Sequence, residues 1–110
     1  MIFAWDDKNR EHLAKHHVSP DEAEEVVART KPPFPMEIGD EKLLVWGQTD
    51  RGRYLQVIYL LKQPHEVEYE SLPVEDWLDV ETGGEIEIVR VVHSMDLTPT
   101  MKKRLRKLQR

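Results

Sequence analysis

The hydrophobic pattern of the chain predicts a small number of strands. The clearest covers residues 53–61, a run rich in Tyr, Val, Ile and Leu that is typical of a buried strand. Residues 42–46 form a second apolar run, and the polar segment 47–52 between the two runs predicts a hairpin. A short strand is expected at residues 2–5 and a longer one at residues 85–93.

Three helices are predicted from their start signals. Asp6 or Asp7 can cap a first helix that ends near residues 16–17. Ser19, Pro20 and Glu22 form a capping box with proline at the first helical position, and the prolines of segment 31–35 end that helix near Arg29.

The last helix starts at Thr98-Pro99, which repeats the cap-plus-proline signal, and runs to about residue 108. The order of elements is therefore strand, helix, helix, strands, helix. It predicts one α+β domain over residues 1–110, with two N-terminal helices and one C-terminal helix on a small, mainly antiparallel sheet.

Charge is distributed unevenly along the chain. The net charge is −5, yet residues 64–87 hold nine acids and no Lys or Arg, and the rest holds 16 bases against 12 acids. The last nine residues hold six bases and no acid. We interpret residues 64–84 as an acidic insertion that folds onto the basic surface or the sheet edge.

Within this insertion, the alternation of residues 65–70 predicts an exposed edge strand, and residues 73–78 predict a short helical turn. Trp77 is expected to pin the insertion to the rest of the domain.

Composition excludes several kinds of site. The chain has no cysteine, which excludes disulfides, thiol catalysis and thiolate metal sites and fits a reducing cytoplasm. It has no apolar run of about 18 residues, so no membrane span is expected. No signal peptide is visible, and we expect a cytoplasmic protein without a cofactor.

Three blocks of sequence carry a resemblance to a known family. They are Trp5-Asp6, Asn9, Lys15-His16, Val18-Ser19 and Glu22-Ala23; then Trp46-Gly47-Gln48-Thr49 and Gly52-Arg53; then Arg90-Val91-Val92 and Asp96-Leu97-Thr98. On these residues the chain resembles the BrnT family, the toxin half of a type II toxin–antitoxin pair. The resemblance covers roughly residues 2–61 and 86–104 and skips the acidic insertion.

The resemblance implies a fold similar to RelE-like ribonucleases, a ribonuclease activity and a neighbouring antitoxin protein as partner. Three positions depart from the family pattern. His17 stands where the family has Gly, in a turn that prefers Gly, and Met95 and Met101 stand where the family has Arg and Glu.

Metal-free RNA cleavage needs a base, an acid and cations that stabilise charge on the phosphate. His16 and His93 are the candidate proton-transfer residues, since imidazole serves either role near neutral pH. The candidate phosphate-binding residues are Lys15, Arg53 and Arg90.

Each of these residues also has a purely structural interpretation. Arg90 interrupts an apolar run and needs a partner, for instance Glu87 or Asp96, if it binds no phosphate. His93 lies three residues after Arg90, so in a regular strand the two face opposite sides unless a bulge intervenes.

A metal site is not expected. His12 and His16 are spaced as two ligands on one helix face, but no Glu follows His12 as in a zincin helix and no third ligand is evident.

Two functions remain open at this point. The first is a BrnT-like toxin, neutralised by an antitoxin, that is either a metal-independent ribonuclease or an RNA-binding protein. The second is a non-catalytic module that keeps the toxin fold and binds a protein. Met95 and Met101 favour the second, because methionine is common at adaptable binding surfaces.

Overall fold

A computed structural model describes residues 1–83 and 86–109. The strands form one sheet in the order β1-β5-β4-β3-β2, and β1 is parallel to β5 while the other pairs are antiparallel. The strands are β1 (Ile2–Phe3), β2 (Met36–Glu37), β3 (Leu43–Gln48), β4 (Tyr54–Lys62) and β5 (Ile88–Asp96). The predicted α+β fold with a mainly antiparallel sheet is confirmed.

Four α-helices accompany the sheet within residues 1–83 and 86–109, one more than predicted. They are α1 (Asp7–Ala14), α2 (Pro20–Ala28), α3 (Trp77–Thr82) and α4 (Pro99–Leu108). Side-chain caps at Asp6, Ser19 and Thr98 start α1, α2 and α4 as the sequence predicts. None of the helices in the described ranges has the length and apolar character needed to cross a bilayer.

The main core lies between α1, α2 and one face of the sheet. Alternate residues of β4 point into it, as expected for a strand with one buried face. The fully buried members that decide this packing are Leu13, Val26, Val27, Val45, Leu55, Val57 and Val91. The predicted hairpin of β3 and β4 is therefore the centre of the fold.

A β-bulge interrupts the pairing of β4 with β5. Ile58 lies opposite His93 and Tyr59 opposite Val91, so Val92 has no partner on β4. Because opposite residues share a face of the sheet, Arg90 and His93 point to the same side, facing Leu60 and Ile58. The bulge also keeps both Val91 and Ser94 fully buried, although they are three residues apart.

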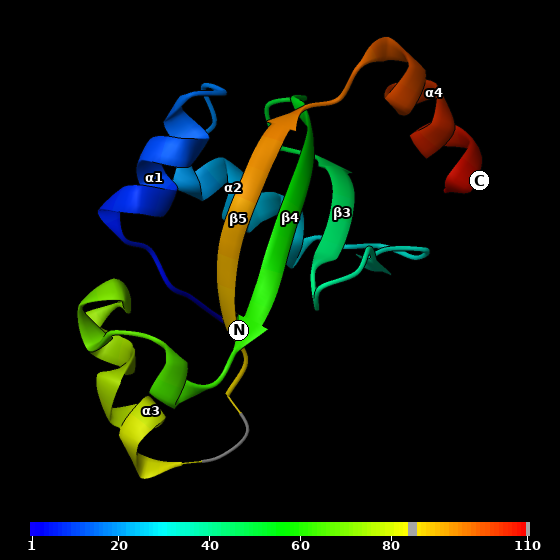
Figure 1. Cartoon of the computed structure of the whole chain (residues 1–110). Coiled ribbons are helices and arrows are strands. Elements are labelled where there is room, and N and C mark those ends of the chain that lie inside the picture. The colour runs from blue at the N-terminus through cyan, green and yellow to red at the C-terminus, as the bar shows by residue number, and fades with distance from the viewer. Residues whose placement is uncertain (84–85, 110) are drawn as a thin grey trace.

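The two outermost strands are too short to cover their neighbours. β1 pairs only with Ile88 and Val89 of β5, and β2 pairs only with Leu43 and Leu44 of β3. Helix α1 lies alongside the uncovered outer edge of β5 (Figure 1). The remaining outer edge of β3 has no strand beside it among the residues described.

Asn9 attaches α1 to the outer edge of β5. Its side-chain Nδ2 donates to the carbonyls of Val91 (3.4 Å) and Ala4 (3.3 Å), and its Oδ1 accepts from the N–H of Asp6 (2.7 Å). Asn9 is one of few buried polar residues among those described, at 5% exposed. Its amide satisfies a carbonyl at the strand edge that no neighbouring strand reaches.

The turn after α1 uses a left-handed residue. His17 has φ +56°, at the position where the resembled family has Gly. The turn thus has a backbone conformation that favours Gly but is formed by a histidine, a residue found in this region more often than most.

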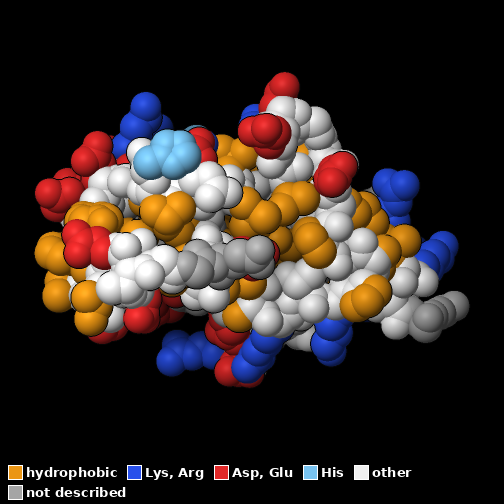
Figure 2. Space-filling view, turned by 90° about the horizontal axis from the view of Figure 1, so that it is seen from below, with side chains coloured by type: hydrophobic (Ala, Val, Ile, Leu, Met, Phe, Trp, Pro, Cys, Tyr) orange, Lys and Arg blue, Asp and Glu red, His pale blue; other side chains and the backbone are white. Residues whose placement is uncertain are grey.

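The acidic insertion folds onto the β1 edge of the sheet, one of the two places expected. Trp77, Leu72 and Val80 pack with Ile2 and Ile88 in a second apolar cluster, which confirms that Trp77 pins the insertion. The insertion forms one end of the molecule, where acidic and apolar side chains gather, while Lys and Arg side chains lie at the opposite end and on other sides of the surface (Figure 2).

The edge strand predicted at residues 65–70 is wrong. The chain forms two 3-10 turns there, η1 (Pro64–Glu66) and η2 (Tyr69–Ser71), followed by η3 (Val74–Asp76). Pro64 presets a turn and the Glu66 side chain accepts from the N–H of Gln63, so local bonds override the alternating pattern. The helical turn predicted at 73–78 is present as η3 and the start of α3.

Residues Gly84 and Glu85, where a strand was predicted to begin, and Arg110 of the basic tail lie outside the described residues.

Replacing the edge-binding amide tests its role in the fold. Asn9→Ala should lower the free energy of unfolding by about 2 kcal/mol, because it leaves two carbonyls at a buried edge without their donor. Urea unfolding measures the change. Lys8→Ala, at an exposed site in the same helix, is the matched control, and equal stability of both variants would contradict the assignment.

Candidate functional site

Three imidazoles meet beside the outer edge of β5. The ring centroids of His16 and His93 are 5.2 Å apart, those of His12 and His93 are 5.9 Å apart, and those of His12 and His16 are 6.4 Å apart. His12 belongs to α1, His16 to the turn that follows it, and His93 to β5. We call this group the histidine edge.

The three rings differ in environment. His12 and His16 are exposed, whereas His93 is half-buried. Burial, and then the positive charges of His16 and His12, lower the pKa of His93 below its ordinary value of 6.5. At neutral pH His93 is therefore mainly a neutral imidazole, which can accept a proton.

Lys15 precedes His16 at the same helix end and is exposed. Its N–H completes α1 by donating to the carbonyls of Glu11 and Leu13. No ion pair of Lys15 occurs within residues 1–83 and 86–109. Its ammonium group is thus available to bind an anion.

Arg90 is ion-paired, but not with the residues that the sequence indicated. Its Nη2 donates to Oδ2 of Asp6 at 2.7 Å, rather than to Glu87 or Asp96. The N–H of Asn9 and, with a smaller effect, the Arg90 guanidinium hold the pKa of Asp6 below its usual range. The pair joins the start of α1 to β5 on the face that also carries His93.

Arg53 is the centre of a larger network. Its Nε donates to Asp96 (2.8 Å) and its Nη1 to Glu22 (3.0 Å). The same guanidinium donates to the main-chain carbonyls of His17 (2.6 Å) and His16 (3.3 Å). Arg53 therefore holds the turn that carries His16 against the hairpin.

The structure thus brings His16 and His93 together with His12, leaves Lys15 exposed next to His16 in the chain, and places Arg53 and Arg90 in ion pairs. The sequence reasoning did not assign His12, Asp6 or Glu22 a place at this site. The spacing of His12 and His16 was a visible signal for a shared face. The contact of both with His93 depends on the bulge, for which the sequence has no clear signal.

Among the residues that the structure describes, no group of three or more His, Cys, Asp or Glu side chains is arranged to hold a metal ion.

Comparison of the chain with protein-family models, with curated proteins and with solved structures gave no match in any of the three.

The Arg53 network has a testable pH dependence. Arg53 lowers the pKa of Asp96 below its ordinary value of 3.8. Burial raises the pKa of Glu22, but the Ser19 N–H and the Arg53 guanidinium together lower it more, so it lies below its ordinary value of 4.5. The resulting stabilisation is complete above those ordinary values and is lost as pH falls through the lowered folded values. Arg53→Met should cost about 1 kcal/mol at pH 7 and less at pH 3.

Urea unfolding at the two pH values measures this difference. Arg51→Met removes the same charge from the neighbouring exposed turn and serves as the control. A cost for Arg53→Met that is the same at both pH values would show that the carboxylates are not its partners.

Proposed function

We propose that the chain is a BrnT-like toxin with a RelE-like fold that binds RNA and cleaves it without a metal ion at the histidine edge. The observation that carries the proposal is the approach of His16 and His93, 5.2 Å between ring centroids, from segments 77 residues apart in sequence. Two imidazoles at this separation can serve one phosphate as base and acid.

His93 suits the base. Its lowered pKa leaves it neutral at neutral pH, so it can accept the proton of a ribose 2′-hydroxyl. The 2′-oxygen then attacks the adjacent phosphorus and the bond from phosphorus to the 5′-oxygen breaks. His16, in its protonated form, gives its proton to the leaving 5′-oxygen. The products are a 2′,3′-cyclic phosphate and a 5′-hydroxyl, and the two histidines exchange protonation states.

Lys15 is the cation best placed for the phosphate, because it is exposed beside His16. Arg53 and Arg90 were the other candidates. A phosphate would have to displace Asp6 from Arg90, or Asp96 and Glu22 from Arg53, before either arginine could bind it. We therefore give both arginines a positioning role, with Arg53 holding the main chain of His16.

The pairing of β4 with β5 and the Arg90–Asp6 ion pair support a second candidate function, a non-catalytic module that binds a protein. Met95, where the resembled family has Arg, lies opposite Gln56 and so shares a sheet face with His93 and Arg90. That face therefore lacks the arginine expected at position 95, and the guanidinium of Arg90 on the same face is ion-paired with Asp6. In both cases an antitoxin protein is the proposed partner and the cytoplasm the proposed location.

Cleavage of RNA by the purified chain separates the two functions. A fluorescently labelled single-stranded RNA should be cut in the presence of EDTA to products with 2′,3′-cyclic phosphate ends. His93→Gln and His16→Gln should each lower the rate by about 10²-fold or more, because each removes a proton-transfer group. His65→Gln, an exposed histidine in the insertion, should leave the rate unchanged.

The pH profile adds a readout that a structural role would not move. Since the base must be unprotonated and its pKa is lowered, the acidic limb of the rate should lie below pH 6.5 and disappear in His93→Gln. Intact RNA with folded wild-type protein, together with harmless expression in cells lacking the antitoxin, would leave the interaction module as the function.

A further inference from the structure

The outer edge of β3 presents unpaired main-chain groups. The N–H of Thr49 donates to the carbonyl of Arg53 at 2.8 Å, so these two residues form a hydrogen-bonded pair at the end of the β3–β4 ladder. Bonding alternates along an antiparallel pair, so the N–H and C=O groups of Trp46 and Gln48 point away from β4. β2 ends opposite Leu44, and no strand reaches these two residues within the described part of the chain.

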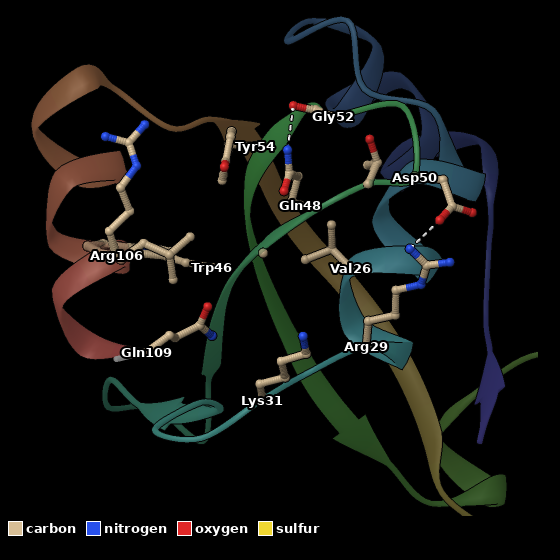
Figure 3. Close-up of a pocket in the computed structure, with 13 residues that line it drawn as sticks. Val26, Arg29, Lys31, Trp46, Gln48, Asp50, Gly52, Tyr54, Arg106 and Gln109 are labelled. Atoms are coloured by element: carbon tan, nitrogen blue, oxygen red, sulfur yellow. Dashed lines mark hydrogen bonds and ion pairs between the residues drawn. The ribbon is translucent and has the colours of Figure 1, made fainter.

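A groove of about 430 Å³ lies over this edge, between α2 and α4. In Figure 3 Val26 and Arg29 come from α2 on one side, and Arg106 and Gln109 come from the C-terminal end of the chain on the other. Trp46 and Gln48 of β3 lie between them. The half-buried indole of Trp46 offers an apolar surface beside the free main-chain groups.

The groove is basic. Helix α4 carries five bases and no acid, and its Arg106 lines the groove together with Lys31. Arg29 also lines it, but its guanidinium is held by Asp50 at 2.5 Å and by Glu25 at 3.3 Å. Lys31 and Arg106 form no ion pair within the described ranges, so the groove favours an acidic occupant.

An extended peptide fits these features better than the alternatives. It supplies N–H and C=O groups at the spacing of a strand, whereas a phosphate group has no donor for the two free carbonyls. A second copy paired edge to edge would bring two basic α4 helices together. The acidic insertion of a second copy is folded into 3-10 turns and α3, so it presents no extended strand.

We propose that the groove between α2, β3 and α4 binds an acidic peptide segment in extended conformation, which adds to the sheet beside β3. Main-chain bonds to Trp46 and Gln48 supply the pairing, and Lys31 and Arg106 select for acidic side chains. The site is on the opposite side of the sheet order from the histidine edge and does not rest on the proposed ribonuclease function.

Peptide selection on the full chain tests the proposal. A display library of random peptides of about twelve residues, longer than a typical strand, is selected on the immobilised protein. Acidic sequences rich in β-branched residues should be enriched. Fluorescence anisotropy with one resynthesised peptide should show binding that weakens about tenfold in Arg106→Glu and in Lys31→Glu.

Lys103→Glu is the matched control, because it makes the same charge change on an exposed position of α4 that does not line the groove. It should change the affinity by less than about twofold, apart from a general loss at low salt. Binding that falls equally in Lys103→Glu and Arg106→Glu would reduce the effect to net charge and overturn the proposal.

Amide hydrogen exchange followed by NMR supplies the structural readout. Saturating peptide should slow exchange at Trp46 and Gln48 and leave His93 unchanged. No enriched peptide, or a bound peptide that leaves both amides unprotected, would overturn the proposal. Displacement of the peptide by single-stranded RNA that itself requires Arg106, without amide protection by the peptide, would reassign the groove to RNA.

Discussion

The bulge at Val92 is the constraint on which the candidate site depends. In an unbroken strand Arg90 and His93 would face opposite sides of the sheet. The extra residue turns both toward the face opposite the core and still leaves Val91 and Ser94 in the core. A purely regular β5 would therefore have to give up either a buried position or the contact between His93 and His16.

The bulge is useful only because α1 is held at the same edge. Asn9 ties the first half of the helix to Val91, and Arg53 ties the turn after it to β4 through the carbonyls of His16 and His17. The first attachment satisfies a carbonyl on the outer edge of β5 beyond the reach of β1, and the second satisfies carbonyls that follow the end of α1. The imidazoles are thus positioned by two polar attachments in addition to the contacts of Leu13 in the core.

The predictable parts of the molecule are those set by neighbours in sequence. The runs of apolar residues located β3, β4 and β5, and the caps at Ser19 and Thr98 located two helix starts, because these signals act within a few residues. The alternating pattern of residues 65–70 predicted an edge strand that does not form, because Pro64 and Glu66 impose a local turn. The partner of Arg90, Asp6, lies 84 residues away, and the position of the bulge depends on how two whole strands pair, so neither was predictable.

The short outer strands explain why the two sides of the sheet have different chemistry. β1 and β2 each cover two residues, which leaves polar main-chain groups exposed along β5 and along β3. On β5 helix α1 covers the edge, and the imidazoles of His12 and His16 contact that of His93 there. On β3 no strand among the described residues pairs with Trp46 and Gln48, and α4, one of the two helices that line the groove there, carries only basic charges. A sheet edge is normally protected by charge or by a covering element. The two groove-lining bases without an ion pair among the described residues, Lys31 and Arg106, lie beside the β3 edge. Two such edges repel each other, whereas an acidic strand is attracted, so the same two residues protect the edge and fit the acidic peptide proposed for it.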